Sequence, residues 1–145
     1  MAWRDRFLLL EAMSWLALAG LAIAVLPFAR LGALASPQIG GRALPYQRRL
    51  VERSRVRWAV VASARWIPWR AMCFQQALAV QFMLRRRGIA SVLYYGAAPD
   101  DQRGLSAHVW VSDGDVMIIG GEIASRFAVL ATFPSQGKVQ PRDRV

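Results

Sequence analysis

Two residues of the chain could together form a nucleophilic site: its single cysteine, Cys73, and its single histidine, His108. A thiolate is the nucleophile of cysteine chemistry, and a helix N-terminus or a neighbouring base favours it. Histidine is the side chain best suited to take and return the proton near neutral pH. Alone, each residue has a plainer explanation, a small buried hydrophobe and a satisfied polar group. A reactive pair is therefore a hypothesis that needs elements to position it.

The apolar segment that begins beside Cys73 predicts the nucleophile helix. Residues 71–87 are apolar on nearly every side, which is typical of a buried helix. Three arginines near its end suit the negative end of the helix dipole. Cys73 then falls in the first turn, where free backbone N–H groups could meet an oxyanion. Gln75 and Gln76 could donate to it as well, although solvent contact is the simpler expectation for both.

After Gly88 the sequence changes from helical to strand character. Strands are predicted at residues 89–96, 106–112, 116–121 and 127–133, where β-branched and aromatic residues gather. A loop and a DG turn separate the first three strands, which predicts an antiparallel meander. Alternation places His108 and Trp110 on the same face of their strand. Helices followed by such a sheet give an α+β fold.

An acid that orients the histidine could lie among the residues around the DG turn. Glu122 is the nearest acid, but simple hairpin registers bring residues 119–121 opposite His108. Glu122 would need a bulge, which the two glycines before it permit. Asp113 and Asp115 are interpreted as turn-shaping residues. The alternative to a triad is a cysteine–histidine dyad oriented by a backbone carbonyl or an amide side chain.

Composition limits the cofactors and partners of the chain. Its 145 residues allow a single domain with one modest core, and 55% of them are hydrophobic. One cysteine excludes an internal disulfide, and so few Cys and His ligands predict no metal and no cofactor. The net charge is +10, with eleven arginines from Arg42 to Arg87. A compositional bias explains this most simply; among partners, an acidic protein or peptide is favoured over nucleic acid, whose motifs are missing.

The first 65 residues predict a helical N-terminal part. Residues 7–28 form a long apolar helix that contains Glu11, and three interpretations compete. They are a signal peptide, a membrane-inserted or surface-lying helix, and a helix docked on the fold or on a partner, which is favoured. Residues 29–45, rich in Gly and Pro, predict a connection, and residues 46–65 predict an arginine-rich helix with its arginines on the solvent face. Residues 66–134 carry the catalytic helix and sheet, and 135–145 form a flexible tail.

Three segments together resemble a known family. They are "CFQQALAVQFMLRRRGIASVLYYGA", "LSAHVWVSDGDVMIIGGE" and "RFAVLATF". A cysteine that opens a helix ending in RRRG, followed by a strand, HxWV and a DG hairpin, is similar to the standalone peptidase half of the split B protein of lasso-peptide biosynthesis. The resemblance covers residues 6–134 approximately. That family belongs to the transglutaminase-like, papain-related cysteine proteases.

The resemblance implies a bacterial, cytoplasmic cysteine peptidase that removes the leader from a ribosomally made precursor peptide. Cys73 would attack the carbonyl at the leader–core junction, His108 would move the proton, and Glu122 would be the third catalytic residue. The implied partners are the precursor peptide, a small leader-binding protein and an ATP-dependent lasso cyclase that acts afterwards. Two alternatives remain: a transglutaminase-like acyltransferase or amidase with the same site, and a non-catalytic membrane-associated adaptor built on residues 7–28.

Overall fold

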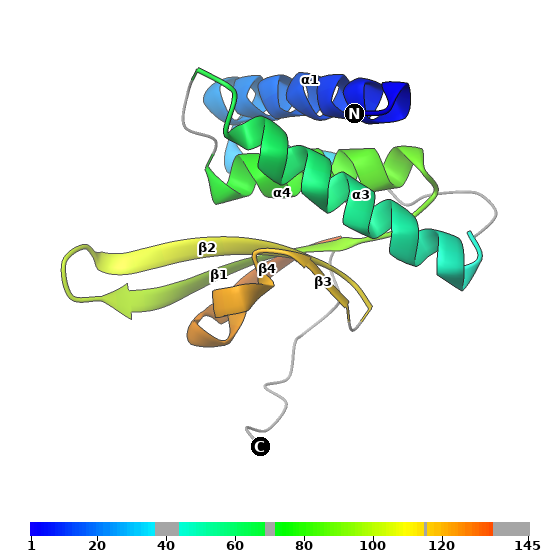
Figure 1. Cartoon of the computed structure of the whole chain (residues 1–145). Helices are drawn as coiled ribbons and strands as arrows, with labels where there is room; N and C mark the ends of the chain where they lie inside the picture. The colour runs from blue at the N-terminus through cyan, green and yellow to red at the C-terminus, as the bar shows by residue number, and fades with distance from the viewer. Residues whose placement is uncertain (37–43, 69–71, 115, 135–145) are drawn as a thin grey trace.

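The computed structural model describes residues 1–36, 44–68, 72–114 and 116–134. Its helices are α1 (Trp3–Val25), α2 (Phe28–Ala35), α3 (Tyr46–Ala64) and α4 (Cys73–Arg86). Its strands are β1 (Val92–Asp100), β2 (Gly104–Asp113), β3 (Val116–Ile119) and β4 (Ala128–Phe133), and a 3-10 helix, η1 (Gly121–Arg126), precedes β4. The helices are stacked over one face of an antiparallel sheet (Figure 1), so the predicted α+β class is confirmed.

The N-terminal apolar segment forms two helices instead of one. Pro27 fixes an extended backbone at Leu26, which ends α1 at Val25. Pro27 itself then serves as the N-cap of α2. The prediction of an irregular connection from residue 29 was therefore wrong as far as Ala35, because alanine and leucine dominate that stretch and favour a helix.

The sheet has the order β3-β2-β1-β4, so the first three strands form the predicted antiparallel meander, and β4 does not continue it. After β3 the chain passes through η1 and returns to pair β4 with β1, on the far edge from β3. The β1–β2 hairpin is also longer than predicted, since its register runs unbroken from Val92↔Ser112 to Asp100↔Gly104. In the turn between these strands, the carboxylate of Asp100 accepts hydrogen bonds from the backbone N–H groups of Gln102 and Arg103.

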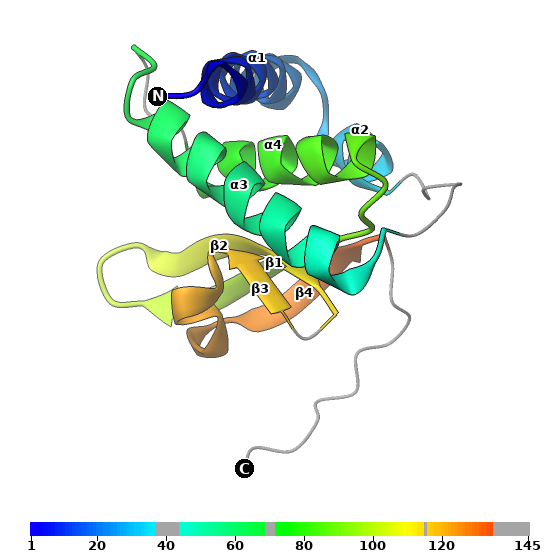
Figure 2. The ribbon, with the colours of Figure 1, turned by 45° about the vertical axis from the view of Figure 1, so that its right-hand side comes forward.

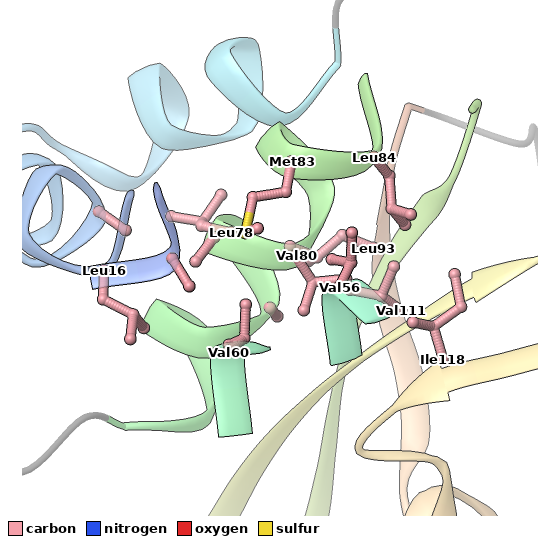
Figure 3. Close-up of a cluster of buried hydrophobic side chains, with 14 of the residues drawn as sticks. Leu16, Val56, Val60, Leu78, Val80, Met83, Leu84, Leu93, Val111 and Ile118 are labelled. Carbon is pink, nitrogen blue, oxygen red and sulfur yellow. The ribbon is translucent and has the colours of Figure 1, made fainter. Parts of the chain in front are cut away.

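Helix α4 is the centre of the core. It lies between α1 on one side and the sheet on the other, with α3 crossing beside it (Figure 2). Figure 3 shows side chains from every layer converging around it: Leu16 of α1, Val60 of α3, Leu78 of α4 and Val111 of β2. All four are fully buried. The first residue of α4 is thus attached to the most tightly packed element of the molecule.

The arginine-rich helix α3 begins and ends within one residue of its predicted bounds. The prediction that its arginines all face solvent was wrong for Arg53, which is buried and forms an ion pair with Asp113 at the end of β2. A buried guanidinium needs a charged partner, and Asp113 provides it. This pair ties α3 to the sheet, so Asp113 does more than shape the turn. Asp115 and the predicted tail at 135–145 lie outside the described residues.

Glu11, the acid inside the apolar α1, belongs to an ion cluster that joins three helices. Arg87, directly after α4, donates to both carboxylate oxygens of Glu11 at 2.7 and 3.0 Å and to Glu52 of α3 at 3.1 Å. The hydrogen bond from Arg87 lowers the pKa of the Glu11 carboxyl, although partial burial opposes it. The acid therefore holds α1 on the helices beneath it. By length and composition alone, α1 could also cross a membrane.

Candidate active site

The thiol of Cys73 is exposed at the N-terminus of α4. Met72, the residue before it, has an extended backbone and supplies the N-cap without any side-chain hydrogen bond. The N–H groups of a first helical turn have no partner within the helix, so they are available to an incoming oxygen. The thiol is thus accessible, and it stands at the positive end of the helix dipole, where negative charge is stabilised.

Gln75 holds this first turn in place, a role that the sequence analysis did not predict. Its side chain is buried, and its Nε2 donates to the carbonyl of Leu16 in α1 at 2.7 Å. Gly20, one turn further along α1, makes room for it, because a Cβ there would lie 2.7 Å from that same nitrogen. Solvent contact and oxyanion binding are both wrong for Gln75. The side chain instead positions the end of α4 that carries Cys73.

The imidazole of His108 is fixed by a backbone carbonyl. Its Nε2 lies 2.7 Å from the carbonyl oxygen of Gly120, just after β3. A carbonyl can only accept, so this contact assigns the proton of the neutral ring to Nε2 and leaves the lone pair on Nδ1. Nδ1 is then the nitrogen that can take a proton from a thiol. The carbonyl would also stabilise the positive ring that results.

Aromatic rings and glycines shape the surroundings of His108. Its ring lies 5.1 Å from that of Phe127 and 5.9 Å from that of Trp110, measured between centroids. The residue opposite His108 on β1 is Gly96, and a Cβ there would lie 2.9 Å from the Trp110 ring. The stacked Trp110 ring and the tilted Phe127 ring limit the rotation of the imidazole. Together with the Gly120 carbonyl they give it one orientation.

Gly120 can occupy its position because it lacks a side chain. Its backbone has a φ of 76°, in the left-handed region, and a Cβ would lie 2.6 Å from the carbonyl oxygen of Val109. Both facts require glycine. From sequence, this glycine is predicted to permit a bulge that would bring an acid to the histidine. In the structure, Gly120 itself presents the acceptor.

Glu122, predicted to lie beside His108, instead pairs with an arginine of α3. It is in η1, its side chain is 67% exposed, and it forms an ion pair with Arg57 of α3 at 3.2 Å. A bulge does interrupt the β2–β3 register, but between Val111 and Ser112, and it does not bring Glu122 to the histidine. The nitrogen that an orienting acid would hold is already bound to a carbonyl. The ring is therefore oriented by a backbone carbonyl, and Glu122 as the third catalytic residue stays a prediction.

The thiol and the imidazole come from two elements that pack together, since α4 contacts β2. Val109 and Val111 face the helices within the core, so alternation directs His108 to the other face of the strand. Within the described ranges, no hydrogen bond joins the Cys73 thiol to any group. The pairing of Cys73 with His108 therefore stays a prediction, and it requires Nδ1 and Sγ to approach each other.

Comparison with known proteins identifies the family. The profile of the transglutaminase-like superfamily matches residues 14–132, which is most of the chain. Searches of curated proteins and of solved structures found no match. Members of the superfamily are typically cysteine-dependent enzymes, in agreement with a chain that exposes its single thiol at a helix N-terminus. The match includes α4, the first three strands and all but the last residue of β4, and the chain belongs to the transglutaminase-like superfamily.

Proposed function

We propose that this protein is a cysteine peptidase that removes the leader from a lasso-peptide precursor. The observation that carries the proposal is the contact of His108 Nε2 with the Gly120 carbonyl, which leaves Nδ1 as a base in a chain whose single thiol is exposed. The choice of substrate rests on the resemblance of the Cys73 helix, its RRRG end and the HxWV strand to lasso leader peptidases. In this proposal a leader-binding protein presents the precursor, and an ATP-dependent cyclase acts on the product.

The reaction follows from the groups available. Nδ1 of His108 takes the thiol proton, and the sulfur of Cys73 attacks the carbonyl carbon of the last leader residue. First-turn N–H groups of α4 stabilise the oxyanion. The proton on Nδ1 passes to the departing amine of the core peptide, which leaves a thioester. Water, deprotonated by Nδ1, then attacks the thioester and releases the leader as a carboxylic acid and the enzyme as a thiol.

No hydrogen bond joins the two reacting groups among the described residues, so in this proposal substrate binds to a conformation in which they meet. Catalytic hydrogen bonds are often long before substrate binds and shorten in the complex. Gln75 fixes the start of α4 and the Gly120 carbonyl fixes the ring, which limits what has to move. Because alternation directs His108 away from the helices, the required change must bring its ring and the N-terminus of α4 to the same side of β2. The net charge of +10 would favour an acidic peptide.

The test is cleavage of a precursor peptide, with its leader-binding protein present, followed by mass spectrometry. Cys73→Ala and His108→Ala should each remove cleavage while circular dichroism shows an unchanged fold. Alkylation of Cys73 by iodoacetamide at pH 7 should be slower in His108→Ala, because the thiol has lost its base. Full cleavage by either variant would contradict the proposal.

A matched pair of variants tests how the histidine is oriented. Gly120→Ala should lower kcat by about 10- to 100-fold, because the added Cβ displaces the carbonyl from Nε2. Glu122→Gln should retain nearly full activity, because its carboxylate binds Arg57. The opposite result, with Glu122→Gln inactive and Gly120→Ala active, would restore Glu122 as the third catalytic residue.

The superfamily match also fits an acyltransferase, in which an amine replaces water in the second step. The same assay distinguishes the two. When a primary amine such as methylamine is added, a peptidase should still give the leader mainly as the free acid. A leader joined mainly to the amine would assign the acyltransferase activity instead.

A further inference from the structure

The outer side of α1 is an apolar surface that nothing among the described residues covers. Its members follow helical spacing along one line of the helix and are 53–72% exposed. We call this surface the outer stripe; it consists of Trp3, Phe7, Leu10, Leu18, Leu21 and Val25. No charged residue occurs between Glu11 and Arg30 in the sequence, and Glu11 faces the other helices. Ser14, whose hydroxyl donates to the Leu10 carbonyl, is the one polar residue on this line. An exposed apolar surface of this length marks an interaction site.

The inner side of α1 is packed against the other helices. Leu8, Ala12, Leu16 and Ala19 are buried against the other helices. Glu11, on the flank of that side, is held by Arg87. For α1 to cross a membrane, this packing would have to be lost and Glu11 would enter lipid, which is costly. The helix can therefore meet a membrane only along its length, with the fold still attached beneath it.

Basic residues lie near the outer stripe. Arg4 and Arg6 are exposed at its start, and Arg30 is exposed in α2, the helix that follows α1 in the chain. Within the described residues, none of these three arginines has an acidic partner. Trp3 lies at the same end as Arg4 and Arg6, as tryptophan commonly does at a lipid–water boundary. An exposed apolar stripe with unpaired arginines near it is complementary to an anionic lipid surface.

The place of α1 in the fold suits such a surface. Figures 1 and 2 both show α1 as the outermost layer, on the side of α4 that faces away from the sheet. Its 23 residues span about 34 Å. The stripe is a straight convex ridge, which fits a plane better than a groove. We infer that α1 docks lengthwise on an anionic lipid surface through the outer stripe, with the sheet and His108 facing the solution.

Co-sedimentation with lipid vesicles tests this inference. The full chain should bind vesicles of phosphatidylcholine and phosphatidylglycerol, should bind pure phosphatidylcholine at least tenfold more weakly, and should be released by alkaline carbonate, as a helix that does not span would be. Leu10→Glu and Leu18→Glu should each weaken binding about tenfold or more, because each removes the burial of one leucine. The double variant Arg4→Gln, Arg6→Gln should lose the preference for phosphatidylglycerol.

The matched control is Leu105→Glu, an equally exposed leucine at the start of β2, which should bind vesicles as the wild type does. Cys73→Ala should do so as well, which separates this inference from the proposed peptidase activity. Circular dichroism checks that each variant is folded. Absence of vesicle binding would overturn the inference: a dimer dissociated by Leu10→Glu would assign the stripe to a second copy, and a monomer would assign it to a partner protein. Resistance to carbonate would overturn the lengthwise orientation.

Discussion

The two ends of α4 are built in opposite ways. At the C-terminal end, Arg87 binds two carboxylates from two other helices and the Met83 carbonyl, all within 3.1 Å. At the N-terminal end, one buried hydrogen bond from Gln75 holds the turn, and the thiol of Cys73 is left exposed. One end therefore fixes the helix in the fold, and the other presents a reactive group. The ion cluster that stabilises the fold and the exposed thiol therefore lie at opposite ends of the same helix.

The largest effect on stability is expected from Arg87→Ala. This change leaves Glu11 and Glu52 without their shared cation, and loss of one partner from a largely buried ion pair is strongly destabilising. Since Arg87 is one-fifth exposed, we expect a loss of about 2–4 kcal/mol in the free energy of unfolding, measured by urea denaturation. Arg86→Ala is the control: its side chain is 62% exposed, and the loss should be below about 0.5 kcal/mol. Equal losses would remove the special role of Arg87.

The pair of Arg87 and Glu11, at the C-terminal end of α4, should make the stability of the fold depend on pH. Because Arg87 lowers the pKa of Glu11 in the folded protein, the unfolded chain binds that proton more readily. The stabilisation is fully present above the usual value of 4.5 and is lost as the pH falls through the lower folded pKa. In Glu11→Gln the fall in melting temperature below pH 4.5 should be shallower than in the wild type. A profile in Glu11→Gln as steep as that of the wild type would refute the assignment.

Smaller effects are expected at the N-terminal end. Gln75→Ala removes a buried hydrogen bond and some packing, and it should cost about 1–2 kcal/mol of unfolding free energy. Cys73→Ala alters one exposed side chain and should change stability by less than about 0.5 kcal/mol. Thermal unfolding of both variants gives the comparison. A marked loss of stability in Cys73→Ala would mean that the thiol supports the fold.

Much of the fold could be predicted because it depends on local patterns. The apolar run after Cys73 and the alternation around His108 define a buried helix and a strand whatever surrounds them. The order of the sheet could not be predicted in this way. Whether β4 pairs with β3 or with β1 depends on the path through η1, whose six residues have no strong periodicity. Strand partners far apart in the chain are chosen by packing on the helices, which a local pattern does not contain.

The site shows the same division. Residue type and position alone pointed to Cys73 and His108 as the candidates, because thiol and imidazole chemistry belongs to the side chains themselves. The partner of the imidazole was decided by tertiary structure: the Gly120 carbonyl reaches Nε2, while Glu122 is attracted to Arg57 on another helix. In the sequence, the glycine at position 120 indicates that the backbone there can adopt a left-handed conformation, but it does not indicate where its carbonyl points. That direction follows from left-handed geometry against β2, which exists only once the strands have paired.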